Sequence, residues 1–574
     1  MQIRFPLIFL LFLLTTASFG QTTYPADYFR SPVDTTIALA GNFGEIRPNH
    51  FHAGFDIKTN NHEGMKIYAA ADGYISRIKI SPVGYGNALY ITHPNGYTSV
   101  YGHLKSFDGV IAAFTKTAQY ALQSFELDTL LSPAMLPVTK GQLIALSGNT
   151  GGSQGPHLHF EIRETATEKP VNPYFFGFVV PDEIKPKITE IVIYPLGENA
   201  LVNGKSQLRK IKTLYKNGKY SYASADTINV SGEIGFGIEC YDTENKSTNQ
   251  NGVYSIELQS GGKRIFYYEM EKFSFENARY VNAHIDYPSK QKHGTKIQKC
   301  FVSKNNQIGI YKDVINSGVL NFTDDSVHWI RYIVKDFVGN TTELMIKVKS
   351  SSKMSNPIRK KDSDIPFDCS VENKFNSEDV KIIIPAYALY EDVVFTYSKP
   401  GSAIGTYSPT HLILNDEVAL QKNISLSIKP VRLPDSLFNK ACIVSINAKG
   451  GKSYEGGAFA DGWVTTQTKE FGNYAVGIDT IPPKLKPAFK TTKYQKVNLS
   501  KAKRIGIIAT DNLSGIREYS ALIDGRWVLL EYEFKQNLLF YTFDASVSSG
   551  EHVFNLEVKD GKGNSSVHSF NFIR

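Results

Sequence analysis

Tryptophan and cysteine are scarce in this chain of 574 residues, with 3 and 4 copies, whereas phenylalanine and tyrosine number 35 and 32. Aromatic residues in such excess favour strands, because their rings pack well on a pleated surface. The cysteines are Cys240, Cys300, Cys369 and Cys442. Their spacing excludes a metal-binding C-x-x-C pair. Pairing within single predicted domains would join Cys240 to Cys300 and Cys369 to Cys442, and free buried thiols are the equal alternative, since domains of this size do not need disulfides.

Dense clusters of one charge are also missing. The formal net charge is +8, and 21% of the residues are charged. Lysine and arginine form no stripe of the kind that binds nucleic acid, so we expect no nucleic-acid partner. A small positive excess is compatible with an anionic polymer such as a cell wall. The hydrophobic content of 42% is that of folded domains rather than of a disordered chain.

Long apolar runs are absent beyond the N-terminus. The segment MQIRFPLIFLLFLLTTASFG has one arginine, an apolar run over residues 5–14 and small residues before Gln21, which is the pattern of a cleaved signal peptide. The run is about ten residues long, too short to span a bilayer. We therefore expect residues 1–20 to be removed and the chain to be exported to the periplasm, the cell envelope or the medium. An uncleaved anchor is the alternative.

The length of the chain and its glycine turns and linker segments predict several β domains. One domain per about 150 residues gives about four, and strand-like alternation broken by glycine turns runs through the sequence. A Ser/Lys-rich stretch and a Pro-Pro joint separate regions of this texture. The expected parts are a signal peptide (1–20), a first β domain (21–180), a β-sandwich (181–350), a linker (351–364), a β-rich domain (365–480) and a final β-sandwich (481–574).

One segment of the first domain breaks the strand rhythm. In DGVIAAFTKTAQYALQSFE, residues 108–126, apolar residues recur at helical spacing and Asp108 is placed as an N-cap. The pattern predicts one helix inserted in a β domain. This helix either walls one side of a substrate cleft or covers the outside of the domain.

A short repeat marks the ends of two of the predicted domains. VKDFVGNTT begins at Val334 and VKDGKGNSS at Val558, and each precedes an alternating strand. Turns rich in Asp, Gly and Asn close antiparallel hairpins, so the repeat predicts the last hairpin of a β-sandwich in both places. The D-x-x-G-N pattern resembles bacterial immunoglobulin-like modules, which implies two or three Ig-like sandwiches and no activity.

Two histidines share one face of a predicted strand in GPHLHFEIR, residues 155–163. Side chains of an extended chain alternate between faces, so His157 and His159 lie together while Leu158 and Phe160 form the apolar side. An isolated H-x-H pair is more often an ordinary surface strand. The pair gains meaning from the histidines found elsewhere in the same domain.

The upstream segment RPNHFHAGFDIKT places His50, His52, Gly54 and Asp56 at alternate positions, on one face of an extended chain. Zinc binds histidine nitrogen and carboxylate oxygen, and catalytic sites use three protein ligands and leave a position for water. His52 and Asp56 would supply two ligands, with the glycine leaving room between them. One histidine of the 157/159 pair would be the third, and alternation does not choose between them.

The segments HFHAGFDI, VYGHL and SGNTGGSQGPHLHFEIR, in that order, closely resemble the lysostaphin/LytM-type family of zinc metallopeptidases, which cut peptide bonds in bacterial cell walls. The resemblance covers about residues 41–173. It implies a mainly β protein with an N-terminal LytM-like antiparallel domain and one zinc ion per chain. The implied zinc ligands are His52, Asp56 and His159, and the implied catalytic residues are His103 and His157.

Two further residues of these faces have open roles. Glu161 shares the face of His157 and His159, where it either orients an imidazole or is an ordinary strand carboxylate. His50 touches substrate, competes as a ligand, or lies at the outer rim of the site, and we favour the outer rim.

The expected function is that of an exported zinc metallo-endopeptidase acting on peptidoglycan cross-links. Its substrate is then a peptide of the cell wall, and its C-terminal domains would bind the wall, the envelope or a protein partner. One alternative is a non-catalytic LytM-like module that binds or regulates other wall hydrolases. Another is a surface scaffold whose peptidase processes a protein. All five site residues are present, which favours the enzyme.

Overall fold

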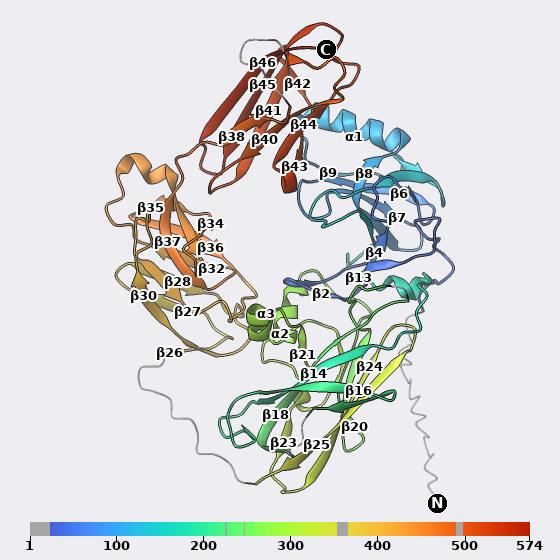
Figure 1. Ribbon diagram of the computed structural model, residues 1–574, viewed down its shortest axis with the longest axis vertical. Coiled ribbons are helices and arrows are strands. Elements are labelled where there is room, and N and C mark those ends of the chain that lie inside the picture. The colour runs from blue at the N-terminus through green and yellow to red at the C-terminus, as the bar shows by residue number, and fades with distance from the viewer. Residues whose placement is uncertain (1–22, 224–226, 246, 353–364, 490–496) are drawn as a thin grey trace, which may run out of the picture.

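The computed structural model describes residues 23–223, 227–245, 247–352, 365–489 and 497–574. The predicted signal peptide and residues 353–364 of the predicted linker lie outside the described residues. The described chain is mainly β, as predicted. Figure 1 shows β units that follow one another around a ring, with the C-terminal unit beside the first. We name them the first (23–180), second (181–350), third (365–478) and fourth (484–574) units.

An antiparallel sheet of 11 strands builds the first unit, along the main path β1-β4-β12-β8-β7-β6-β10. Its strands β4, β12 and β8 lie side by side and hold the candidate site. The elements of the unit are β1 (Leu39–Gly41), β2 (Ile46–Arg47), β3 (His50–Phe51), β4 (Phe55–Lys58), β5 (Lys66–Tyr68), β6 (Gly73–Ile80), β7 (Asn87–Thr92), β8 (Tyr97–Phe107), α1 (Gly109–Leu122), β9 (Leu127–Leu130), β10 (Pro137–Val138), β11 (Leu143–Ser147), β12 (His157–Glu164) and β13 (Pro170–Val171).

The predicted inserted helix is α1, and it begins directly after Asp108. The backbone of Asp108 is extended, as at an N-cap, but its side chain makes no capping hydrogen bond. The buried residues of the helix are Ile111, Thr115 and Gln119. Leu122, one of the apolar residues that recur at helical spacing, is 63% exposed. The helical period was therefore read correctly, but its inner face is partly polar. No helix in the described part combines the length and apolar character that crossing a bilayer requires.

Helix α1 supports the fourth unit. Lys116 forms an ion pair with Asp544, and the ring of Tyr120 lies edge-on to Trp527 with centroids 5.2 Å apart. Figure 1 shows the helix beside the C-terminal strands. Neither predicted role of the insertion, as a wall of the cleft or as an outer cover, includes this contact with the fourth unit. Sequence alone does not show that the C-terminal unit packs against the first.

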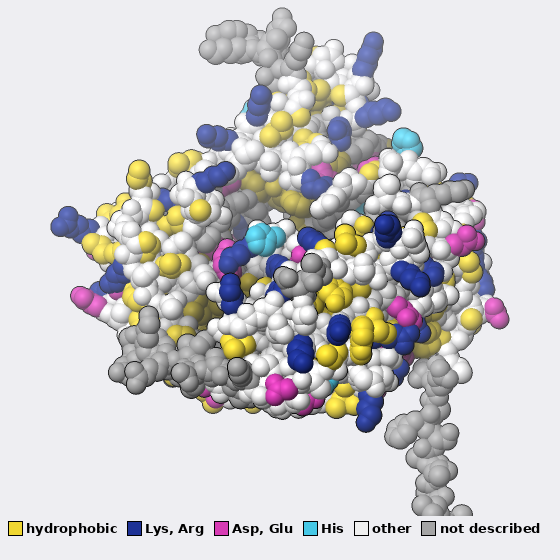
Figure 2. All heavy atoms as spheres, turned by 60° about the horizontal axis from the view of Figure 1, so that its bottom comes forward, with side chains coloured by type: hydrophobic (Ala, Val, Ile, Leu, Met, Phe, Trp, Pro, Cys, Tyr) yellow, Lys and Arg dark blue, Asp and Glu magenta, His cyan; other side chains and the backbone are white. Residues whose placement is uncertain are grey.

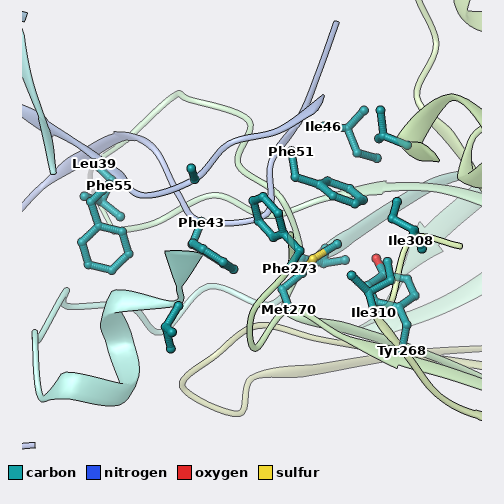
Figure 3. Close-up of a cluster of buried hydrophobic side chains, with 14 of the residues drawn as sticks. Leu39, Phe43, Ile46, Phe51, Phe55, Tyr268, Met270, Phe273, Ile308 and Ile310 are labelled. Atoms are coloured by element: carbon teal, nitrogen blue, oxygen red, sulfur yellow. The ribbon is translucent and has the colours of Figure 1, made fainter. Parts of the chain in front are cut away.

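The first and second units share one hydrophobic core. The second unit is a network of 12 strands that includes β14 (Lys187–Pro195), β18 (Ile228–Tyr241), β24 (Val327–Lys335) and β25 (Thr341–Ser350). Figure 3 shows Phe43 and Phe51 of the first unit among side chains of the second. Their ring centroids lie 5.1 and 5.7 Å from that of Phe273. The sequence change near residue 180 thus marks a change of sheet and not a break in packing.

The third and fourth units each have a core of their own, between two sheets. The third has two five-stranded sheets, and the fourth has a four-stranded and a five-stranded sheet. Strands β45 (Glu551–Asp560) and β46 (Ser565–Ile573) of the fourth unit form an antiparallel hairpin, as do β24 and β25 of the second. The hairpins predicted from the VKD repeat are therefore confirmed. On the face in Figure 2, lysine and arginine side chains are scattered and form no stripe.

All four cysteines lie in the described part, and all are buried and free. The alternative of free thiols therefore holds, and neither disulfide forms. Burial raises the pKa of each thiol, to about 11 for Cys369 and Cys442. A buried thiol is a weak nucleophile because the thiolate is the reactive form.

We expect the native protein to resist thiol reagents at pH 8. Titration with a chromogenic disulfide should find almost no reactive thiol in buffer and all four in denaturant. A rapid reaction of even one thiol in buffer would show that its burial is not permanent.

Candidate metal centre

Pairing of three strands brings the histidine motifs together. In the antiparallel register of β4 with β12, Asp56 is opposite His159, and in that of β8 with β12, Gly102 is opposite His159. Leu158 and Phe160 of β12 are fully buried in the core, so the alternate residues face the other side, as predicted. His52 precedes β4 and reaches the same place from the connection between β3 and β4.

Three candidate ligand atoms converge on one point. His52 Nε2 lies 3.0 Å from Asp56 Oδ1 and 3.0 Å from His159 Nδ1, and the last two atoms are 2.9 Å apart. The three residues are 2%, 4% and 4% exposed. His52, Asp56 and His159 are also the set that the family resemblance implied. Alternation had left the choice between His157 and His159 open, and the strand register places His159 against Asp56.

The second nitrogen of each imidazole fixes its tautomer. His52 Nδ1 is 2.7 Å from the carbonyl oxygen of Asn42, and His159 Nε2 is 2.7 Å from Glu161 Oε1. Each of these nitrogens must carry a proton, because carbonyl and carboxylate oxygens only accept hydrogen bonds. In the neutral imidazoles, His52 Nε2 and His159 Nδ1 therefore carry lone pairs that face the same point as Asp56 Oδ1.

Three buried acceptors at this spacing fit a cation. Without a positive charge between them they would repel and leave their hydrogen-bonding capacity unused. Atoms 2.0–2.2 Å from a tetrahedral ion lie about 3.3 Å apart, close to the separations here. Two imidazoles and one carboxylate are one of the donor sets that catalytic zinc sites use. The residues present thus fit the metal.

The electrostatics of the ligand set favour a positive guest. Although burial opposes its charge, neighbouring histidines hold the pKa of Asp56 well below its usual range. Burial lowers the pKa of His159, but the hydrogen bonds that its ring donates to Asp56 and Glu161 outweigh this effect and raise the pKa to about 9. In the chain without metal, a proton on His159 supplies the charge that the acceptors need. Metal binding at such a site displaces that proton.

His103 and His157 stand beside the ligand set, with ring centroids 4.7 Å apart. His103 lies in β8 with a positive φ of 59°, a rare conformation outside glycine that turns its side chain out of the strand's regular alternation. Its Nδ1 is 2.8 Å from the carbonyl oxygen of Thr150, and His157 Nδ1 is 2.8 Å from that of Gly155. Both rings therefore have an Nε2 lone pair available.

The Nε2 atom of His157 is buried and finds no hydrogen-bond partner among the described residues, although Asp56 Oδ1 lies 3.3 Å away. An unpaired buried nitrogen is costly unless a ligand or substrate engages it. Burial, and then the neighbouring imidazoles His159 and His157, lower the pKa of His103 to about 3. His103 is therefore neutral in the chain without metal, and its free nitrogen can accept a proton.

Glu161 orients His159, which decides between its two predicted roles. It is fully buried, and its Oε1 atom accepts hydrogen bonds from His159 Nε2 and from the hydroxyl of Tyr85, which lies 2.5 Å away. Its Oε2 atom is 2.6 Å from Arg163 Nε. Burial disfavours the charged carboxylate, but Arg163 and His159 reverse the effect and lower the pKa of Glu161 to about 2.

We expect Glu161→Gln to weaken zinc binding by about 10- to 100-fold, because an amide can present its NH₂ group to His159 and no longer balances Arg163. Glu168→Gln is the matched control, since Glu168 also contacts Arg163 but is exposed. Competition with a chromogenic chelator measures both affinities. Equal affinities of the two variants would exclude this role for Glu161.

Two expectations about the upstream motif need correction. The chain from His50 to Asp56 is not one extended strand, because β3 ends at Phe51 and β4 begins at Phe55. His50 agrees with the favoured prediction of an outer-rim residue, because it is exposed and turns its Nδ1 to the carbonyl oxygen of Pro48, outside the ligand set. Gly54 leaves room for protein rather than for metal, since a Cβ atom there would lie 2.2 Å from the carbonyl oxygen of Phe160.

Several supporting residues were missed by sequence reasoning. Arg47 lies 2.5 Å from the outer oxygen of Asp56, while Asn42 and Thr150 contribute backbone carbonyls. Carbonyls belong to every residue, so no sequence signal exists for them. Arg163 continues the alternation of the HLHFEIR strand and could have been found by extending the pattern that gave Glu161.

Comparisons with known proteins match two regions of the chain. The Peptidase family M23 matches residues 50–114 and 115–173, and the Zu5-like domain family matches residues 364–479. The DD-carboxypeptidase/endopeptidase Mpg of Neisseria meningitidis serogroup B is 34% identical over 131 residues, which are 23% of this chain and 24% of that protein. The murein hydrolase activator NlpD of Salmonella dublin is 32% identical over 157 residues, 27% of this chain and 33% of that protein.

Among solved structures, a zinc-containing peptidase from Vibrio cholerae is 27% identical, covers 28% of this chain and 40% of that chain, and has a TM-score of 0.18. This chain thus matches only a minor part of each relative. The matched region nevertheless contains all five residues of the predicted site.

The antiparallel β domain contains a buried His-Asp-His set and lies in the region that matches peptidases. These features are those of a peptidase domain. Residues 50–173 of this chain form a domain of Peptidase family M23. The predicted resemblance to lysostaphin/LytM-type peptidases is thereby confirmed, as is the mainly β fold.

Proposed function

We propose that this protein is an exported zinc metallo-endopeptidase that hydrolyses peptide bonds in peptidoglycan cross-links. The convergence of His52 Nε2, Asp56 Oδ1 and His159 Nδ1 within 3.0 Å of one another carries the proposal. Relatives named as a DD-carboxypeptidase/endopeptidase and as a murein hydrolase activator support the cell wall as the site of action. The N-terminal signal-like segment supports export to the periplasm or envelope.

The proposed roles follow from the geometry. His52, Asp56 and His159 would hold one zinc ion, which would supply Lewis-acid polarisation of the scissile carbonyl and activation of a water as nucleophile. His103 and His157 present free Nε2 atoms beside the ligands. In their neutral form these atoms take a proton from the attacking water, and once protonated they donate hydrogen bonds to negative charge that develops on the substrate.

Hydrogen bonds around the site hold these imidazoles in the required tautomers. Carbonyls of Thr150 and Gly155 hold the two imidazoles in one tautomer, so neither ring must reorient before it receives a proton. Glu161 holds His159 in the tautomer that a ligand needs. The C-terminal units would then position this domain on the wall, on the envelope or on a protein partner.

Zinc content and the release of new peptide termini from purified peptidoglycan test the proposal. The chain without residues 1–20 should hold one zinc ion and cleave, and His159→Ala should lose both properties. His62→Ala is the matched control, because His62 is an exposed histidine of the same unit and should keep both. A protein without zinc, or cleavage that persists in His159→Ala, would refute the proposal.

The named alternative is a module that activates other wall hydrolases, which the relative NlpD favours. In that case the chain would bind zinc or wall fragments without cleaving them, and adding it to a purified amidase would raise the amidase rate. Cleavage of a protein but of no wall fragment would instead favour the surface scaffold.

A further inference from the structure

Three aspartates from separate parts of the sequence meet at the joint between the first and second units. Asp182 belongs to the segment that enters the second unit, Asp242 follows β18, and Asp336 begins the turn after β24. One carboxylate oxygen of each lies within 4.8 Å of the others. Asp242 and Asp336 are 4% and 5% exposed.

The three carboxylates lack a positive partner. None of them forms an ion pair with lysine, arginine or histidine in the part of the chain that the structure describes. Asp336 accepts hydrogen bonds from Gly339 and Asn340, and Asp182 accepts one from the backbone of Ile184. Three like charges at this separation repel strongly in a buried site, and burial together with the carboxylates of Asp182 and Asp336 raises the pKa of Asp242 to about 8.

Asp242 supplies a second and independent observation. Its Oδ1 atom is buried and has no hydrogen-bond partner among the residues described. All three aspartates line one cavity of about 10 Å³, together with Asn42 and Tyr174 of the first unit. This volume has room for about one water-sized guest. An orphan carboxylate oxygen at such a cavity is unfavourable unless a guest binds it.

The joint between the third and fourth units repeats the arrangement. Asp479, Asp511 and Asp560 also bring carboxylate oxygens within 4.8 Å, and Asp511 Oδ1 is likewise buried without a partner in the described chain. Both D-x-x-G-N turns use their asparagine in the same way. Asn340 donates to the carboxylate of Asp336 and the carbonyl of Asp182, and Asn564 donates to those of Asp560 and Asp479. The same unpaired oxygen in two separate units indicates a shared requirement.

We propose that Asp182, Asp242 and Asp336 form a calcium site at the joint between the first and second units. The donors are oxygens only, which favours a hard cation over zinc. Oxygens 2.3–2.6 Å from one calcium ion lie at most about 5 Å apart, as these do. Calcium also accepts irregular coordination with water completing the shell, whereas magnesium demands a nearly ideal octahedron.

The ion would brace the joint from both sides. Tyr174 of the first unit stacks on Phe337 of the second with ring centroids 4.6 Å apart, directly beside the cavity. Binding would neutralise the repulsion and so stabilise this packing. It would not require the zinc centre, whose ligands are a different set of residues.

Calcium titration of the chain without residues 1–20, in buffer freed of metals by resin, tests the site. We expect heat from binding and a rise of at least about 4 °C in the thermal midpoint at saturating calcium. Asp242→Asn, which keeps the shape and removes the charge, should lose one calcium equivalent and raise the midpoint of the calcium-free protein, because repulsion is relieved. Zinc content should not change.

Asp313→Asn is the matched control, because Asp313 is an exposed aspartate of the same unit and should bind calcium as the unchanged chain does. Should Asp242→Asn fail to fold, Asp182→Asn removes a carboxylate that is only half-buried and should lose the same equivalent. No calcium response up to 10 mM, a response to magnesium alone, or undiminished binding by the folded Asp242→Asn or Asp182→Asn variant would overturn the assignment.

Discussion

Replacing His157 with alanine is expected to lower peptide hydrolysis by about 100- to 10,000-fold while leaving one zinc ion bound. The loss follows from removing a buried Nε2 atom that has no partner in the described protein and stands beside the ligands. Zinc should remain because His52, Asp56 and His159 are untouched. His103→Ala should behave alike, since the carbonyl of Thr150 holds its Nδ1 and so leaves an Nε2 lone pair available.

Zinc analysis and kcat/KM, measured side by side on one defined cross-linked peptide, separate the two kinds of residue. His159→Ala should lose metal and activity together, whereas His157→Ala should lose activity alone. His62→Ala again serves as the control. Loss of zinc from His157→Ala would make His157 a ligand and would reassign the roles within the HLH motif.

Gly54→Ala should destabilise the first unit by at least about 2 kcal/mol and impair zinc binding. An added Cβ atom would lie 2.2 Å from the carbonyl oxygen of Phe160 and 2.8 Å from the Cγ atom of Glu161. The first of these atoms belongs to the backbone of β12, so the strand that carries His159 must move. Strands β4 and β12 hold Asp56 opposite His159, and their separation would spoil the ligand geometry.

Thermal denaturation and zinc affinity measure this effect. Gly155→Ala is the control, because Gly155 has open space at its Cβ position and no positive φ, although it lies only two residues from His157. The control should shift the midpoint by no more than about 1 °C. If the two alanine variants were equally stable, the close approach at Gly54 would not be rigid.

Sequence patterns predicted the site well wherever side chains and strand period carry the information. Alternation placed His157 and His159 on one face and Leu158 in the core, which β12 confirms. Alternation worked less well upstream, because the turn after Phe51 interrupts the strand before Asp56. His52 and Asp56 still meet His159, because the pairing of β4 with β12, and not one continuous strand, brings them together.

The features that could not be predicted from the sequence depend on backbone groups far away along the chain. The carbonyls of Asn42 and Thr150 set the tautomers of His52 and His103, and nothing in a sequence distinguishes one carbonyl from another. The contact of α1 with Trp527 was hidden for a similar reason, because it depends on how the later units turn. Helix period and glycine turns are local signals, whereas the path of the whole chain is not.

The shared core of the first two units sets a limit on dissecting the protein. The Peptidase family M23 match ends at residue 173. The backbone carbonyl of Asn42 holds His52, however, and the side-chain amide of Asn42 donates one hydrogen bond to Gly252 and accepts another from it. A recombinant fragment cut near residue 180 would expose Phe43 and Phe51 to water and leave that amide unpaired. The smallest fragment that keeps the metal centre intact should therefore run to residue 350.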